Sequence, residues 1–508
     1  MQHHFFKWSP LLLIIWGIIY SVFLPIIPVA GGFGWDGVLY GQMAMDFENM
    51  FGDIKTYNAS RIFPSVLIYY AFKVAGIAAG TTEVLTAFMV YNIMVLGLSA
   101  FLWVRIALHL SLGYWAKWLG FCALFVSFPL LNFIFYYPAN TDSTAFLLGM
   151  IIWWAYLKNN NYVLLAAGVL AFFSWPALLP LVCIIFIFRH SGNMRDFTLD
   201  KPHPFWLFVL LLAPFLAFLS LHFAAELHHL AALLNVSNAV TAKMAEKSTQ
   251  GFHLFSFFNA LTKAAFLVFV FWFLLRNFDI LKFVKSLAKR RLIGKLLILA
   301  AVFVPFHYLK TIYSAPEGSS SGLLGFMVLI VTGENVRMPL QFTFMHISYW
   351  GPAVILMFLF AKNMSRFLAQ SSVALNMIFL LTILFGIHSQ SRFLSGFYPF
   401  LVYILLMAVD WEQTWARKKA TALLFVVVSL LYARIWHIYE LPATPFPVMG
   451  DKVHLFPMQW FFMNNGSFAN TQMLILNAIL AAVFVGVFYK LLYVKGMRSV
   501  ISQKKSPS

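Results

Sequence analysis

Charged residues and cysteines are scarce in this chain. Only 10% of its 508 residues are charged, and Asp and Glu together number 17. Soluble domains carry about 25% charged residues, so the composition excludes an ordinary soluble protein. The two cysteines, Cys122 and Cys183, lie inside apolar segments and have no obvious disulfide partner. They leave the redox compartment open.

Nucleotide-binding signatures are also missing. The chain has no GxxxxGK[ST] loop and no GxGxxG after a predicted strand, so we do not expect it to draw energy from ATP. Its net charge of +18 would suit a nucleic-acid partner, but the basic residues do not gather in one patch. We therefore predict no nucleic-acid binding.

Hydrophobic residues, by contrast, make up 62% of the chain and form apolar runs from end to end. A helix of about 20 apolar residues crosses a hydrocarbon core of about 30 Å. We predict an all-α polytopic membrane protein, with a single membrane domain over 1–508 and about fourteen transmembrane helices. The predicted spans cover residues 10–29, 84–104, 115–135, 142–157, 162–174, 176–188, 204–224, 262–275, 296–312, 346–361, 371–387, 394–409, 420–436 and 471–492.

The basic residues sort to one side of these spans. Clusters occur at Arg105/Lys117, Arg189/Arg195/Lys201, Arg276 to Lys295, Lys362/Arg366, Arg417/Lys418/Lys419 and Lys495 to Lys505. Because cytoplasmic loops retain Lys and Arg, this side and both termini are expected to be cytoplasmic. The assignment requires that the apolar stretch 62–79, in the first outer loop (30–83), does not cross. We expect it to be an interfacial helix broken by Pro64 and Gly76.

Two short apolar segments, 162–174 and 176–188, meet at Trp175-Pro176. Lys158 and Arg189 flank their far ends, which favours a hairpin of two short helices. The alternative is one long helix kinked at Pro176.

Two carboxylates stand out on the predicted outer face, which is where we place the active site. Asp36 lies among glycines, where the backbone can turn tightly and approach a ligand closely. Asp142 lies in the second outer loop, where the fourth span begins. Together they suit general-base catalysis or coordination of a divalent cation such as Mg²⁺ or Mn²⁺. The alternatives are a solvated loop Asp for Asp36 and helix capping for Asp142.

Two arginines lie on the same predicted side. Arg61 precedes Ile-Phe-Pro, and Arg392 lies at the outer mouth of a span. Guanidinium groups bind phosphate through two parallel hydrogen bonds, so both residues are candidates for an anionic lipid substrate. Each taken alone could instead extend to lipid head groups.

The outer loop over 313–345 is expected to be mobile. A polar lead-in is followed by an apolar stretch too short to cross, which suits a segment that closes over a lipid-borne substrate or packs on neighbouring helices. It contributes Glu317, Glu334 and Arg337 as candidate substrate ligands. A zinc site at His222, His228 and His229 is not expected, because adjacent side chains on a helix point apart.

Several short motifs resemble the GT-C superfamily of integral membrane glycosyltransferases. They are Asp-Gly-x-x-Tyr (Asp36, Gly37, Tyr40), Tyr-x-x-x-Arg-x-x-Pro (Tyr57, Arg61, Pro64), the second-loop Asp142, the segment around Trp175-Pro176, and Ser391-Arg392-Phe393-Leu394 followed by Tyr398-Pro399. A lone Asp142 stands where some families have paired acidic residues, which leaves metal dependence open.

The resemblance implies a sugar donor carried on a polyprenyl phosphate and used on the outer (periplasmic, extracellular or lumenal) face. Asp36 would be the catalytic carboxylate, assisted by Asp142, and Arg392 and Arg61 would hold the donor phosphate. Tyr40, Tyr57 and Gln390 join the candidate substrate ligands. The acceptor would be a lipid, a glycan or a protein.

Two other functions remain open from the sequence. An outer-face glycan polymerase or ligase would use a diphosphate-linked donor. A transporter or lipid flippase would carry a site near the membrane midplane, but the predicted spans hold few ionisable groups near their centres and show no internal repeat.

Overall fold

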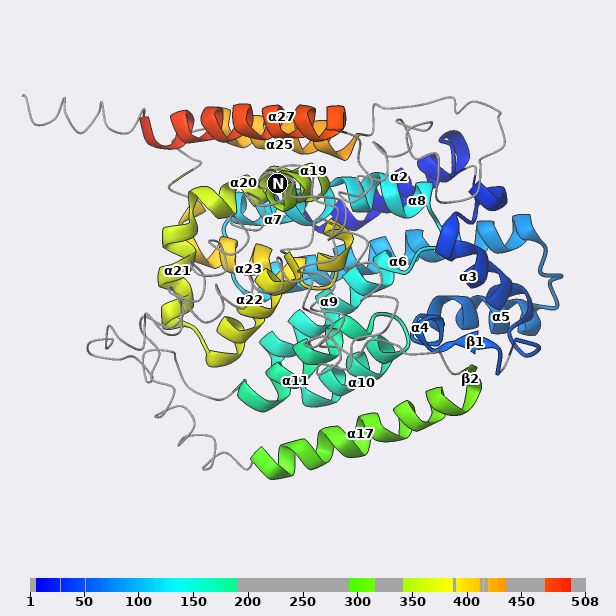
Figure 1. The fold of residues 1–508 in the computed structure, drawn as a ribbon. Helices are drawn as coiled ribbons and strands as arrows, with labels where there is room; N and C mark the ends of the chain where they lie inside the picture. Colours follow the sequence, from blue (N-terminus) through cyan, green and yellow to red (C-terminus); the bar gives the residue numbers. More distant parts are fainter. Residues whose placement is uncertain are drawn as a thin grey trace, which may run out of the picture.

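The computed structural model describes residues 6–27, 29–50, 52–189, 292–315, 341–386, 390–411, 414, 419–434 and 471–494. Helices dominate this part of the chain, and most of the longer ones run in similar directions (Figure 1). The predicted helical architecture is therefore confirmed for the described residues. Two of the predicted spans, 204–224 and 262–275, lie outside them.

The helices fall into two groups along the sequence. The first group contains α2 (Ser9–Phe23), η1 (Val29–Gly32), α3 (Trp35–Asp46), α4 (Thr56–Ala59), α5 (Phe63–Ala75), α6 (Thr81–His109), α7 (Tyr114–Phe125), the π-helix η2 (Pro129–Phe133), α8 (Ile134–Tyr136), α9 (Asp142–Lys158), α10 (Asn161–Phe172), η3 (Pro176–Leu178) and α11 (Leu179–Phe188). The second contains α17 (Leu292–Tyr313), α19 (Gln341–Trp350), α20 (Pro352–Leu359), α21 (Ala361–Gln370), α22 (Val373–Gly386), η5 (Ser391–Leu394), α23 (Tyr398–Ala408), α25 (Lys419–Ala433), α27 (Thr471–Tyr489) and the π-helix η7 (Lys490–Val494).

Some of these helices are long and apolar enough to cross a membrane. By length and composition there are three in the described residues, Thr81–His109, Leu292–Ile312 and Ile475–Leu492, or up to five if each of two bent pairs is one span. Of the most apolar 18-residue stretch of α17, only 6% is buried within the protein, whereas 56% of the corresponding stretch of α6 is buried. The uncovered apolar side chains of α17 are suited to lipid.

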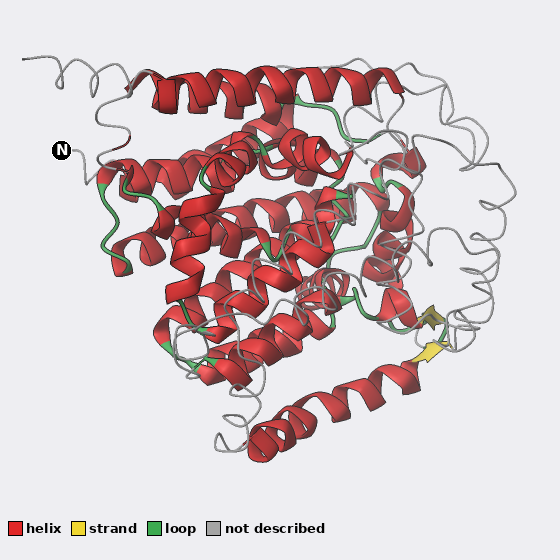
Figure 2. Cartoon of the chain, turned by 60° about the vertical axis from the view of Figure 1, so that its left-hand side comes forward, coloured by secondary structure: helices red, strands yellow, loops and turns green. Residues whose placement is uncertain are grey.

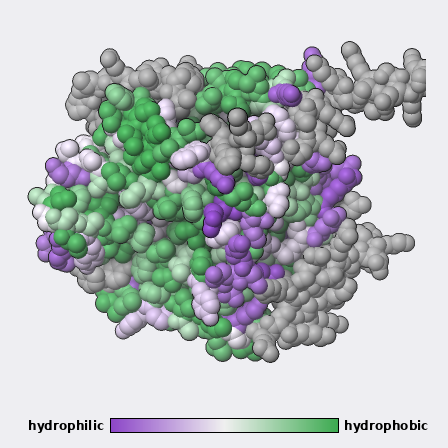
Figure 3. Space-filling model, turned by 180° about the vertical axis from the view of Figure 1, so that it is seen from behind, coloured by the Kyte–Doolittle hydropathy of each residue, from purple (hydrophilic) through white to green (hydrophobic). Residues whose placement is uncertain are grey.

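The views of the whole molecule agree with a membrane protein. Helices α17 and α27 lie on opposite sides of the bundle (Figures 1 and 2). Broad hydrophobic areas, crossed by narrower hydrophilic ones, cover the face seen in Figure 3. Most other predicted spans appear as shorter apolar helices, so the structure supports membrane helices without fixing their number at fourteen.

Two segments that we predicted as single helices are broken. The helix over 115–135 bends by 55° between α7 and the segment Pro129–Tyr136. The helix over 346–361 ends at Trp350, since Gly351 adopts a left-handed φ of 81° and Pro352 opens α20. Proline lacks the N–H that continues a helix, and glycine tolerates positive φ. Helix α20 then bends by 72° into α21.

The short segments around Trp175 form a hairpin, as predicted. Arg189, at the end of α11, donates hydrogen bonds to the side-chain oxygens of Asn159 and Asn161 at 3.2 and 2.9 Å, and to the carbonyl of Ala155 at 2.8 Å. The far end of α11 therefore returns to the start of α10. A single kinked helix would hold these ends apart.

The segment predicted to be the first outer loop, 30–83, folds into a small unit on one end of the bundle (Figure 1). Helix α5 has Pro64 in its first turn and ends at Gly76, whose φ of 65° caps it, as the sequence indicated. A departure from the all-α prediction is the parallel pairing of β1 (Ile54–Lys55) with β2 (Ser314–Ala315), which ties this loop to the end of α17 (Figure 2).

This unit has its own hydrophobic cluster. Side chains of α3, α5 and the first turns of α6 form the smaller cluster, and the rest of the bundle forms a larger one. Tyr137 belongs to the larger cluster and Ala139 to the smaller. The loop that leads to Asp142 therefore passes where the two clusters meet.

Candidate active site

Asp36 lies in the first turn of α3, directly after a tight glycine turn. Gly34, with φ of 72°, precedes the helix. A Cβ atom at Gly34 or Gly37 would lie 2.5 or 2.9 Å from ring carbons of Tyr137, and the Gly37 N–H donates to the Tyr137 hydroxyl at 3.0 Å. The glycines thus admit an aromatic ring from the second outer loop, whereas we had expected them to admit a ligand.

Tyr137 was not among the predicted site residues. Its ring is buried, and burial, with the nearby charge of Asp36, raises the pKa of its hydroxyl. The phenol therefore stays protonated at neutral pH. It acts as a hydrogen-bonding group that joins the two loops rather than as a base.

The carboxylate of Asp36 faces a guanidinium from the distant end of the sequence. Arg392 Nη2 lies 3.5 Å from Asp36 Oδ2, and the two side chains are 16% and 43% exposed. Arg392 is positioned by η5, the short turn between α22 and α23. Two predicted site residues are thus brought together, and the Asp36 carboxylate remains open to a ligand.

Asp142 is the first residue of α9 and is only 2% exposed. Within the described part of the chain its carboxylate oxygens make no hydrogen bond, and the capping contact that we weighed is not seen. The charges of Arg392, Arg61 and Asp36 all act on this carboxyl. The two predicted acids and the two predicted arginines therefore form one electrostatic cluster.

Arg61 is held by the corner of the α10–α11 hairpin. Its guanidinium carbon lies 4.5 Å from the centroid of the Trp175 ring, and the side chain is 7% exposed. The Phe63 N–H donates to the carbonyl of Phe173 at 3.0 Å, which fixes the backbone nearby. A cation over an indole face is stabilised by the ring quadrupole, so Arg61 has a defined orientation.

Asn92 on α6 holds the loop before Asp142. Its amide nitrogen donates to the carbonyls of Ile134 and Pro138, each at 2.8 Å, and its amide oxygen accepts from Ser143 Oγ at 2.7 Å. All three contacts are buried. One side chain therefore fixes both ends of the segment that carries Asp142 into the cluster.

Tyr349 on α19 is a further residue that sequence reasoning missed. It is buried, and the charges of Asp142 and Arg392 act on its hydroxyl. The sequence contains 20 tyrosines, and nothing in its local pattern separates Tyr349 from packing aromatics. Its position became apparent only through the three-dimensional contacts.

The remaining predicted ligands are less well placed by the structure. Tyr40 is buried on α3, where it acts electrostatically on Tyr137. Gln390 is half-buried and directly precedes η5. Tyr57 lies in α4, and only its backbone is described. The other three predicted ligands, Glu317, Glu334 and Arg337, lie outside the described residues, as does most of the predicted mobile loop over 313–345.

A divalent cation fits the described cluster poorly. No group of three or more His, Cys, Asp or Glu side chains with metal-binding geometry occurs in the part of the chain that the structure describes. Asp36 faces Arg392, and both guanidinium groups act on Asp142, so the positive charge is already supplied by the protein.

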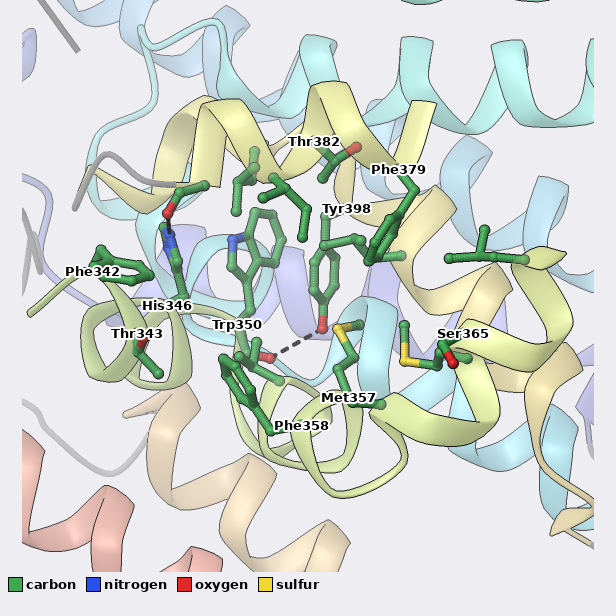
Figure 4. Close-up of a pocket in the computed structure, with 18 of the residues that line it drawn as sticks. Phe342, Thr343, His346, Trp350, Met357, Phe358, Ser365, Phe379, Thr382 and Tyr398 are labelled. Atoms are coloured by element: carbon green, nitrogen blue, oxygen red, sulfur yellow. Dashed lines mark hydrogen bonds between the residues drawn. The ribbon is translucent and has the colours of Figure 1, made fainter. Parts of the chain in front are cut away.

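An apolar cavity of about 400 Å³ lies beside η5, among α19 to α23. Its lining includes Phe358, Leu368 and Phe379, with His346, Gly386 and Leu394 at the end next to η5 and Lys362 and Ser365 on α21 (Figure 4). Leu394 is two residues from Arg392. No pattern in the sequence indicated this cavity, because its walls come from six separate elements.

The chain matches no protein-family model, no curated protein and no solved structure. Function must therefore be inferred from the residues of the chain itself.

Proposed function

We propose that this chain is an integral membrane glycosyltransferase of the GT-C type, which moves a sugar from a polyprenyl-phosphate donor to a lipid, glycan or protein acceptor. The observation that carries the proposal is the cluster of Asp36, Asp142, Arg61 and Arg392, drawn from four separate segments. Such a set supplies a base and two phosphate-binding cations at one place.

The donor phosphate would bind Arg392, with Arg61 as the second cation. Arg392 is 16% exposed and so retains access from outside the cluster. The apolar cavity begins two residues away, at Leu394, and gives a polyprenyl chain an apolar site next to this cation. An anionic group attached to a long apolar chain is the chemistry that this combination suits.

Asp36 would act as the base. As the acceptor hydroxyl attacks the anomeric carbon, its proton passes to the Asp36 carboxylate, and the bond between the anomeric carbon and the phosphate oxygen breaks. The electron pair of that bond leaves with the phosphate, where Arg392 and Arg61 stabilise the added charge. Direct displacement inverts the configuration at the anomeric carbon.

Binding and turnover test this proposal separately. Protein in lipid nanodiscs is titrated with undecaprenyl phosphate, and a panel of polyprenyl-phosphate sugars is assayed for release of the sugar. Arg392→Lys keeps the charge but loses the bidentate fork, so we expect weaker binding and turnover, with Arg392→Ala weaker still.

Arg105→Lys is the matched control, since Arg105 is exposed on α6, where its guanidinium carbon lies 5.7 Å from the centroid of the Phe101 ring. It should leave both measurements unchanged. Wild-type protein that neither binds undecaprenyl phosphate nor consumes any donor would refute the proposal.

A further inference from the structure

The segment that carries Arg392 is attached to α19 by His346. His346 Nε2 lies 2.6 Å from the carbonyl oxygen of Gly386, and Nδ1 lies 2.8 Å from Ser391 Oγ. Gly386 is the last residue of α22 and Ser391 the first of η5. One imidazole therefore contacts both sides of the connection that immediately precedes Arg392.

The chemistry of these contacts fixes the position of one ring proton. A carbonyl oxygen only accepts hydrogen bonds, so Nε2 carries a proton and donates to Gly386. In the neutral ring, Nδ1 then accepts from the hydroxyl of Ser391. The side chain of His346 is 7% exposed, so water does not compete strongly for either contact.

Trp350, one helical turn after His346, adds a third contact. Its Nε1 donates to the carbonyl of Ser391 at 3.2 Å. The Trp350 ring stacks on Tyr398 with centroids 4.0 Å apart, and the Tyr398 hydroxyl donates to the carbonyl of Ala123 at 3.0 Å. Figure 4 shows His346, Trp350 and Tyr398 along the cavity. The support behind His346 is therefore rigid.

We infer that His346 is a positioning residue for Arg392: it holds the start of η5 so that the guanidinium faces Asp36 and the donor phosphate. That the anion is a donor phosphate rests on the proposed function. That His346 places residue 392 rests on the geometry alone. His346 also lines the cavity, so it is in contact with both parts of the site.

Kinetics provide the first test. His346→Phe keeps the ring volume and removes both hydrogen bonds. We expect the KM for the polyprenyl-phosphate donor to rise about tenfold, the equivalent of one lost hydrogen bond of about 1.4 kcal/mol, with the acceptor KM unchanged. His346→Asn, which keeps an acceptor near Ser391, should recover part of the loss. In an Arg392→Lys background His346→Phe should cause no further rise, because both changes act on the same contact.

The control is Tyr156→Phe on α9, which removes a hydrogen bond to Ser372 Oγ at 2.9 Å and lies outside the cavity lining and η5. It should leave the donor KM unchanged. Equal donor KM values for wild type and His346→Phe would overturn the inference. A donor KM in the double variant that rises by the product of the two single-variant effects would overturn it as well.

A second test does not depend on the activity. In a background without Cys122 and Cys183, the pair Asp36→Cys and Arg392→Cys is cross-linked with a short bifunctional thiol reagent. If His346 places residue 392, His346→Phe should slow cross-linking several-fold while Tyr156→Phe leaves the rate unchanged. An unchanged rate in His346→Phe would overturn the inference even if the chain proves not to be a glycosyltransferase.

Discussion

The two carboxylates of the cluster differ in exposure, and this difference separates their roles. The side chain of Asp36 is 43% exposed, whereas Asp142 is 2% exposed. A base must reach the proton that it removes, which only Asp36 can do without movement of the surrounding loops. Asp142 is buried where the charges of Arg392 and Arg61 act on it, and it is not placed to reach an acceptor.

The first prediction concerns Asp36. Asp36→Asn is nearly isosteric but cannot accept a proton, so we expect turnover to fall by about 10²-fold or more with folding intact. Sugar transfer is measured with purified wild-type and variant proteins that are equally monodisperse. Asp46→Asn, at the exposed end of the same helix, is the control and should be near normal. Near-normal transfer by Asp36→Asn would exclude Asp36 as the base.

A second prediction concerns Tyr137. Tyr137→Phe leaves the buried Gly37 N–H without its acceptor, so we expect unfolding to become easier by about 1–3 kcal/mol. Because burial raises the pKa of Tyr137, ionisation favours the unfolded state, and the stabilisation is complete below about pH 10 and declines at higher pH. Denaturation of wild type and variant from pH 7 to 11 measures both effects. Tyr162→Phe, at a residue that is 88% exposed, is the control and should leave the free energy of unfolding at pH 7 unchanged.

At the scale of single elements, one amide on α6 determines where a neighbouring helix begins. The three hydrogen bonds of Asn92 lie on both sides of Asp142. Within the loop itself, the Asn140 N–H donates to the carbonyl of Tyr137 at 3.3 Å. The loop that carries the buried acid is therefore held by α6 as well as by its own turn.

We predict that Asn92→Ala affects both stability and the site. Two buried carbonyls lose their donor, so we expect a loss of more than about 2 kcal/mol in unfolding free energy and a lower turnover. Asn376→Ala is the matched control, because that buried amide donates to the carbonyls of Leu368 and Ser372 away from the cluster. It should destabilise the protein without a comparable change in turnover per folded molecule. Equal turnover in the two variants would contradict the assignment.

The helices and turns that could be predicted from the sequence are those whose ends are set by nearby residues. Pro64 and Gly76 mark the ends of α5, and basic residues at both ends of the 162–188 segment indicated the hairpin. The break at Gly351-Pro352 also had a local signal, but the apolar run over 346–361 outweighed it in our prediction. Hydropathy reports the length of an apolar segment and is insensitive to a bend within it.

At the scale of the whole molecule, the site residues were predictable individually but their partners were not. Asp36, Asp142, Arg61 and Arg392 stood out because charges are rare in an apolar chain. Tyr137, Tyr349 and His346 did not, since aromatic and polar side chains inside helices usually serve packing. The cavity required the packing of six elements, which no sequence period encodes.

A further prediction concerns which side of the membrane each loop faces. In a background without native cysteines, Asn49→Cys in the first outer loop should react with an impermeant thiol reagent in intact cells, and Arg366→Cys on α21 only after permeabilisation. Both positions are exposed, so access depends on the side of the membrane. Labelling of Arg366→Cys in intact cells would contradict the topology derived from the positive residues.

The contact between Asp36 and Arg392 has a kinetic consequence. Without a donor, the Arg392 guanidinium faces the Asp36 carboxylate across 3.5 Å, so each group partly blocks access to the other. An incoming phosphate competes for the guanidinium and thereby frees the carboxylate. Under the proposed function, the enzyme should then follow a compulsory order with the donor binding first. Product-inhibition patterns would show released polyprenyl phosphate competing with the donor at every acceptor concentration, whereas random addition would contradict this sequence of events.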